Sequence, residues 1–99
     1  MTEKHLVLIS TLFNQERTAM DAMREAERNS NIRIGEGAVY TMLKRLEADG
    51  LVRSTYRGDP EQRRGGARRR YYALTGTGAR ALTDAFEGMS RSMGGAHAQ

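Results

Sequence analysis

Residues 35–52, GEGAVYTMLKRLEADGLV, decide the fold of this chain. Apolar side chains recur here at helical spacing, which predicts an amphipathic helix that begins near Glu36. Its predicted core-facing residues are Val39, Leu43, Leu46 and Gly50. Gly50 is also well placed as the left-handed residue that closes the helix. The opposite side, with small, hydroxyl and cationic side chains, is predicted to face outward.

A hairpin is predicted directly after this helix. Residues 51–56 indicate a first strand, the segment after it a loop around the only proline of the chain, and residues 68–74 a return strand. Thr75 is placed to cap a last helix. A helix, a turn and a hairpin with a basic tip are the layout of a winged helix-turn-helix. The predicted fold class is therefore mainly α with a small β-hairpin: three helices, a two-stranded wing and a C-terminal helix.

Two further elements are expected before residue 35. Residues 4–13 form an apolar block, which composition alone leaves open between a short helix and a strand. Residues 14–17 are polar and indicate a turn. Thr18 is a plausible N-cap for a second helix that runs to about Asn29 with small apolar residues along one face.

The motif residues of these elements resemble the PadR-like family of transcriptional regulators. The family signature runs Gly-x-x-Tyr-x-x-Leu-x-x-Leu-Glu-x-x-Gly-Leu-Val and then Tyr-x-Leu-Thr. In this chain it is filled by Gly37, Tyr40, Leu43, Leu46, Glu47, Gly50, Leu51 and Val52, and then by Tyr72, Leu74 and Thr75. The spacing holds across two elements, which makes the resemblance specific. It implies a DNA-binding domain whose members commonly respond to small aromatic or amphipathic effectors.

The excess positive charge lies in the predicted wing. The chain has 16 Lys and Arg against 12 Asp and Glu, a net charge of +4. Residues 57–70 contain six arginines and two acids, so this segment alone accounts for +4, and the remainder, with ten of each sign, is neutral. Because the charge is concentrated in one segment, a polyanion is the expected partner.

Two surfaces are predicted to contact double-stranded DNA. The outer face of the helix after Gly35 can approach bases and phosphates, and arginines of the wing can bind phosphate or enter a narrow minor groove. The resemblance implies that Tyr40 lies against the DNA backbone, although packing would also account for it. The predicted DNA-binding residues are Gly37, Ala38, Tyr40, Thr41, Lys44, Arg45, Arg63, Arg64, Arg68, Arg69 and Arg70.

The last helix is predicted to carry a homodimer contact. Its apolar residues recur at coiled-coil spacing, although such a seam could also pack on its own domain. The predicted dimer residues are Leu82, Phe86, Met89 and Met93. The resemblance implies dimerisation through C-terminal helices that are often longer than this one, and the apolar block at 4–13 could add dimer surface. We divide the chain into a DNA-binding domain (residues 1–78), a C-terminal helix (79–93) and a disordered tail (94–99).

Several classes of protein are excluded or disfavoured. The chain has no Cys, which excludes disulfides and thiolate metal sites. No apolar run could span a membrane and no signal segment is apparent, so a cytoplasmic location is expected. The only histidines, His5 and His97, lie near the ends. We therefore expect neither an enzyme, nor a cofactor, nor a metal site.

We interpret the chain as a sequence-specific, double-stranded DNA-binding transcriptional regulator, a repressor that acts as a homodimer on a palindromic operator. Two alternatives stay open. The run RRGGAR at residues 63–68 fits a non-specific RNA or single-strand binder. A winged helix can also serve protein contacts. A small-molecule effector is possible, but few aromatic residues are present to form its pocket.

Overall fold

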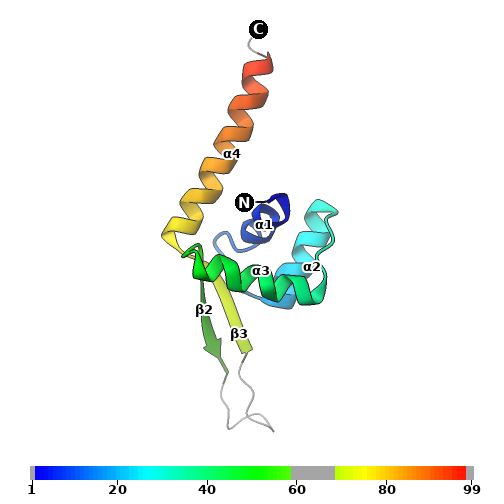
Figure 1. Cartoon of the computed structure of the whole chain (residues 1–99), viewed down its shortest axis with the longest axis vertical. Coiled ribbons are helices and arrows are strands. Elements are labelled where there is room, and N and C mark those ends of the chain that lie inside the picture. The colour runs from blue at the N-terminus through cyan, green and yellow to red at the C-terminus, as the bar shows by residue number, and fades with distance from the viewer. Residues whose placement is uncertain (1, 59–68, 98–99) are drawn as a thin grey trace.

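The fold is mainly helical, with a small antiparallel sheet (Figure 1). The computed structural model describes residues 2–58 and 69–97, and the side chains among them as far as residue 88. The elements in chain order are α1 (Glu3–Ser10), β1 (Arg17–Thr18), α2 (Ala19–Ser30), α3 (Glu36–Ala48), β2 (Val52–Arg57), β3 (Arg69–Leu74) and α4 (Gly76–His97). The predicted winged helix-turn-helix is confirmed.

The first two helices begin at threonine caps. The Thr2 side chain accepts a hydrogen bond from the His5 N–H, so the apolar block that composition left ambiguous forms helix α1. The Thr18 hydroxyl accepts from the Asp21 N–H at 3.2 Å, as predicted for the N-cap of α2. Helix α2 ends at Asn31, whose φ of 59° is left-handed. Residues 31–35 then form the turn into α3.

Helix α3 buries one face and ends in a Schellman motif. Val39, Leu43 and Leu46 are fully buried or nearly so, as predicted. After Ala48 the chain turns at Gly50, whose φ of 79° confirms the predicted left-handed residue. The Leu51 N–H donates to the Leu46 carbonyl at 2.9 Å, and the Gly50 N–H to the Glu47 carbonyl at 3.0 Å. Gly50 itself is exposed and does not face the core, because the helix has ended before the periodicity reaches it.

The sheet has three strands in the order β1-β3-β2, whereas the sequence predicted two. The additional strand β1 has only two residues, within and next to a segment predicted as a turn. Arg17 pairs with Tyr72, and Thr18 with Tyr71. A two-residue strand is too short to show an alternating pattern, so its place depends on the partner strand rather than on its own sequence. The pairing of β2 with β3 runs from Val52↔Leu74 to Arg57↔Arg69 and forms the predicted wing.

One hydrophobic core joins the three-helix body, the base of the wing and the first turns of α4. Small alanines of α2 let that helix approach the others closely. The buried residues of the cluster are Leu8, Ile9, Leu12, Ala19, Ala22, Ala26, Ile34, Val39, Leu43, Leu46, Val52, Tyr72 and Leu82. This shared core fixes α3 against the sheet.

Helix α4 leaves the body on the side opposite to the wing (Figure 1). It runs for 22 residues to His97, so the predicted end at Gly94-Gly95 and the start of a tail there are wrong. A glycine inside a helix costs about 1 kcal/mol relative to alanine, which weakens a helix without ending it. Residues 98–99, the remainder of the predicted tail, lie outside the described residues. Nowhere along residues 2–58 and 69–97 is there a helix with the length and apolar character needed to cross a membrane.

The start of α4 is clamped to the turn that ends α3. The Thr75 hydroxyl donates to the Gly50 carbonyl at 2.6 Å, and the Thr75 N–H to the Leu51 carbonyl at 3.1 Å. The same hydroxyl accepts from the Gly78 N–H at 2.9 Å, which confirms the predicted cap. A Cβ atom on Gly78 would lie 1.9 Å from the Leu51 carbonyl oxygen, so only glycine fits there.

We expect Gly78→Ala to destabilise the protein by about 3 kcal/mol, since the added methyl must displace backbone. For a domain of this size the melting temperature would fall by roughly 10 °C or more. Gly88→Ala is the matched control in the same helix, because a Cβ there meets nothing within 4 Å. That variant should melt at the wild-type temperature or slightly above it. Equal melting of the two variants at one protein concentration would contradict the clamp.

Candidate nucleic-acid interface

The outward face of α3 is a surface of small and cationic side chains. The predicted residues on this face, all exposed, are Gly37, Ala38, Thr41, Lys44 and Arg45. A Cβ atom on Gly35 or Gly37 would meet nothing within 4 Å. Packing within the chain therefore does not require these glycines. Their effect is to leave the first turn of α3 without bulk, so that another molecule can approach its backbone closely.

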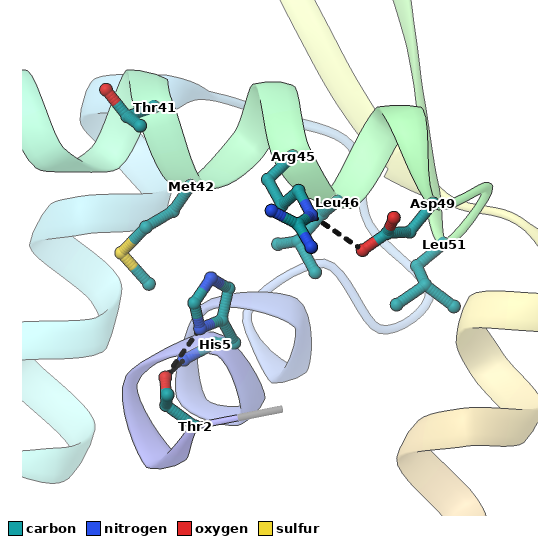
Figure 2. A pocket seen from close by; sticks show the side chains of 8 residues that line it. All are labelled: Thr2, His5, Thr41, Met42, Arg45, Leu46, Asp49 and Leu51. Atoms are coloured by element: carbon teal, nitrogen blue, oxygen red, sulfur yellow. Dashed lines mark hydrogen bonds and ion pairs between the residues drawn. The ribbon is translucent and has the colours of Figure 1, made fainter.

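Arg45 lies on the flank of α3 that faces α1. Figure 2 shows its guanidinium turned toward Asp49. The distance from Arg45 Nε to Asp49 Oδ2 is 3.4 Å. The pair borders a shallow pocket that His5 and Thr2 line on the α1 side. Both side chains of this pair are largely exposed. Exposed pairs of this kind contribute only about 0–1 kcal/mol, so Arg45 can leave Asp49 at little cost when an anion approaches.

Tyr40 lies on the side of α3 toward the wing, near enough to Tyr72 of β3 to act on its pKa. Its side chain is 49% exposed, so it is not a core residue. About half of this side chain is covered by its own chain and half is open to a ligand, so both explanations that the sequence left open stay compatible with its position. Its proximity to DNA stays a prediction.

The wing is tied to α3 through the carboxylate of Glu47. The Ser54 hydroxyl of β2 donates to Glu47 Oε2 at 2.7 Å. The Arg70 guanidinium of β3 donates from Nη2 to Glu47 Oε1 at 2.9 Å. The guanidinium carbon of Arg70 also lies 5.5 Å from the ring centroid of Tyr56 and 5.4 Å from that of Tyr72. Arg70, predicted to bind DNA, thus has three partners within its own chain.

Tyr72 is buried at the centre of this arrangement. Burial raises the pKa of its hydroxyl above the ordinary value; Arg70 opposes the shift, and Glu47 adds to it. The side chain is 4% exposed. The base of the wing is therefore part of the core, and only its outer residues are available to a ligand.

The remaining described arginines of the wing differ in their surroundings. Arg57 pairs with Glu16 at 2.6 Å and lies over the ring of Tyr71, 5.8 Å from its centroid. Arg53 and Arg69 are exposed, and no ion pair joins either of them to another described residue. The predicted DNA-binding residues Arg63, Arg64 and Arg68 lie outside the described residues.

A second exposed surface is apolar and lies between α1 and α4. Phe86 is 55% exposed and lines a groove with Leu6 and Val7 of α1 and Ala85 of its own helix. Phe13 lines an adjoining groove beside Phe86. We call Leu6, Val7, Phe13, Ala85 and Phe86 the apolar face.

One of the four residues predicted for the dimer contact changes its role in the structure. Leu82 is only 4% exposed and belongs to the core of its own protomer, so it offers little area to a partner. The same helical spacing that suggested a seam places Leu82 against α1. The side chains of Met89 and Met93 lie outside the described part of the chain. Phe86 alone of the four predicted residues is described and exposed.

One residue of the interface was missed in the sequence. Glu47 fills a position of the family signature, yet it was not among the predicted site residues. A partial signal existed, because Glu47 falls next to the core-facing sector of α3 rather than opposite to it. Its partners on β2 and β3 could not be read from the sequence. No group of three or more His, Asp or Glu that could hold a metal is found among the described residues.

The chain is similar to known proteins in sequence and in fold. The model of the "Transcriptional regulator PadR-like family" matches residues 8–84. A PadR family transcription regulator from Clostridium difficile R20291 is 28% identical, with a TM-score of 0.72 over 91% of this chain and 93% of that one. A PadR-like transcription factor from Bacteroides fragilis is 21% identical, with a TM-score of 0.79 over 95% of this chain and 86% of that one. No curated protein matches the sequence.

Proposed function

Because the chain belongs to the PadR-like family of transcriptional regulators, its function is DNA-binding transcriptional regulation, and we propose that it is a repressor that binds a palindromic operator as a homodimer. The observation that carries the proposal is the outward face of α3, which is small and cationic and has a wing fixed beside it. In this proposal α3 enters the major groove and the wing follows the neighbouring backbone.

The base contacts are assigned to the middle of α3. Lys44 is exposed on the outward face, and no ion pair with another described residue holds it. Arg45 has only the weak pair with Asp49. Both side chains can reach the O6 and N7 acceptors of guanine, and Thr41 and Ala38 can touch a thymine methyl group. Gly37 leaves room for a phosphate at the first turn of α3. Tyr40 faces the DNA backbone between α3 and the wing.

The phosphate contacts are assigned to the wing. Arg69 is exposed near the outer end of β3. Arg63, Arg64 and Arg68 belong to the same basic segment of the sequence, where each phosphate neutralised steepens the salt dependence of binding by about 0.9 units. Arg70 is left out of this set, because its partners are Glu47 and two tyrosines.

A second copy of the chain is the proposed partner of the apolar face. Phe13, in the turn after α1, and Phe86 of α4 are both more than half exposed and line one groove. A two-fold contact there would leave both wings and both α3 helices free. Two such helices can read half-sites about one DNA turn, ~34 Å, apart. Repression then follows from occupying promoter DNA.

Binding to the DNA upstream of its own reading frame tests the DNA-binding proposal. Against random duplex and single-stranded RNA, we expect a preference of ~10³-fold or more for the upstream duplex, with a steep salt dependence. Lys44→Ala should reduce that preference by about 1–3 kcal/mol, since it removes a base contact. Arg80→Ala, which removes an exposed cation of α4, is the control and should bind like wild type. Equal, steeply salt-dependent binding to all three nucleic acids would instead support a general nucleic-acid binder.

Analytical ultracentrifugation tests the homodimer. We expect the wild-type protein to sediment as a dimer and Phe86→Ser to shift it toward the monomer, because burying one aromatic side chain is worth roughly 2–3 kcal/mol. Tyr56→Ser is the matched control, since it removes a similarly exposed aromatic ring from the wing. The apolar face is not the dimer contact if both variants stay dimeric, or if the wild-type protein is a monomer at micromolar concentration.

A further inference from the structure

We propose that Glu47 is a positioning residue that holds the wing at one angle to α3, and that Arg70 serves this contact instead of binding a DNA phosphate. The proposal rests on the proposed function only in that α3 and the wing form the surface that meets DNA. The angle between them matters because the two elements must reach different parts of the duplex at the same time.

Both carboxylate oxygens of Glu47 accept a hydrogen bond from the wing. Oε2 accepts from Ser54 of β2, and Oε1 accepts from Arg70 of β3. These two partners belong to different strands, so the contact joins the helix to the whole hairpin rather than to one edge. Glu47 is partly buried, with 32% of its side chain accessible, whereas Arg70 is exposed at 42%. Partial burial strengthens charge-assisted hydrogen bonds relative to those on an open surface.

The guanidinium of Arg70 is oriented from a second direction as well. Tyr56 of β2 is the register partner of Arg70 across the wing. Tyr72 lies two residues after Arg70 on β3, on the same face of the strand. Both rings lie within the range of a cation–π contact. A planar arginine can keep these contacts and still donate to Glu47, which a lysine cannot do equally well.

The wing is held to the body at several points, and among the described residues the side-chain hydrogen bonds that join both of its strands to α3 are those to Glu47. The chain passes from α3 to β2 through the turn at Gly50, and Thr75 clamps that turn. Strand β1 pairs with Tyr71 and Tyr72 of β3, and Arg57 pairs with Glu16, but these contacts hold the wing to the segment before α2 rather than to α3. Ser54 and Arg70 lie further out along the wing than the clamp, so Glu47 fixes the angle between the wing and α3.

The direction in which removal of the Glu47 charge changes DNA affinity separates a positioning role from a passive one. A carboxylate near DNA repels phosphate, so removing its charge from a passive position should raise DNA affinity. Removing it from a positioning residue should lower affinity, even though the protein becomes more positive. Glu36→Gln provides the passive control, since Glu36 is an exposed acid in the first turn of the same helix.

The first experiment needs no DNA. The chain has no Cys, so spin labels can be placed at Ala38→Cys on α3 and Thr55→Cys on β2, both exposed positions, and mixing with excess unlabelled protein leaves one labelled protomer per dimer. We expect one narrow distance distribution in the otherwise wild-type protein and in Glu36→Gln, and a broadened or shifted one in Glu47→Gln and in Arg70→Lys. Ser54→Ala, which removes only one of the two hydrogen bonds, gives the same test if Glu47→Gln fails to fold. A narrow, unchanged distribution in the folded variants would overturn the proposal.

The second experiment measures duplex affinity with unlabelled protein. Glu47→Gln should bind about tenfold more weakly than wild type, the change expected from losing one charge-assisted hydrogen bond. Arg70→Lys should also bind more weakly, and the double variant no more weakly than the worse single one. Higher affinity for Glu47→Gln, with Arg70→Lys unchanged, would assign Arg70 to phosphate and overturn the proposal. If wild type itself shows no duplex preference, the proposed function fails, while the spin-label result still decides the role of Glu47.

Discussion

The turn that ends α3 is the constraint on which the rest of the structure depends. Three features meet there: the Schellman motif at Gly50, the capping threonine Thr75 and the close approach of Gly78 to the Leu51 carbonyl. The clamp joins the end of one helix to the start of another across the whole wing hairpin. Because it closes this loop, the wing must leave the body beside α3, and α4 must leave it in the opposite direction (Figure 1).

The arginines of the wing divide between holding the structure and facing outward. Arg70 is committed to Glu47 and to the two tyrosine rings, and Arg57 to Glu16 and Tyr71. Arg53 and Arg69 face solvent. A count of charges in residues 57–70 therefore overstates how many are available to a polyanion. The net charge of the segment attracts DNA at a distance, but fewer side chains are free to contact phosphates.

Features that depend only on residues close by in the sequence were predicted well. The caps at Thr18 and Thr75, the left-handed Gly50 and the buried stripe of α3 each follow from spacing within one element, and each was confirmed. The fold class follows from the order of those elements. The exposed positions on the outer face of α3 were likewise predictable, although their contact with DNA stays a prediction.

Features that depend on a distant partner could not be predicted. Strand β1 exists because Tyr71 and Tyr72 are beside it. Arg70 was assigned to DNA because its sequence neighbours are arginines, whereas its partner Glu47 is 23 residues away. Leu82 follows a coiled-coil spacing, yet α1 of its own protomer covers it. In each case the neighbour that decided the role of a residue came from another segment of the chain.

The central claim is that α3 and the wing meet duplex DNA as one surface, presented twice by a two-fold dimer. Hydroxyl-radical footprinting of the protein on its upstream duplex tests that claim most directly. The claim predicts protection on one face of the DNA. Each half-site spans a major groove and the adjoining backbone, and the two half-sites lie about ten base pairs apart. A single protected block without this repeat, or uniform protection along the duplex, would contradict it.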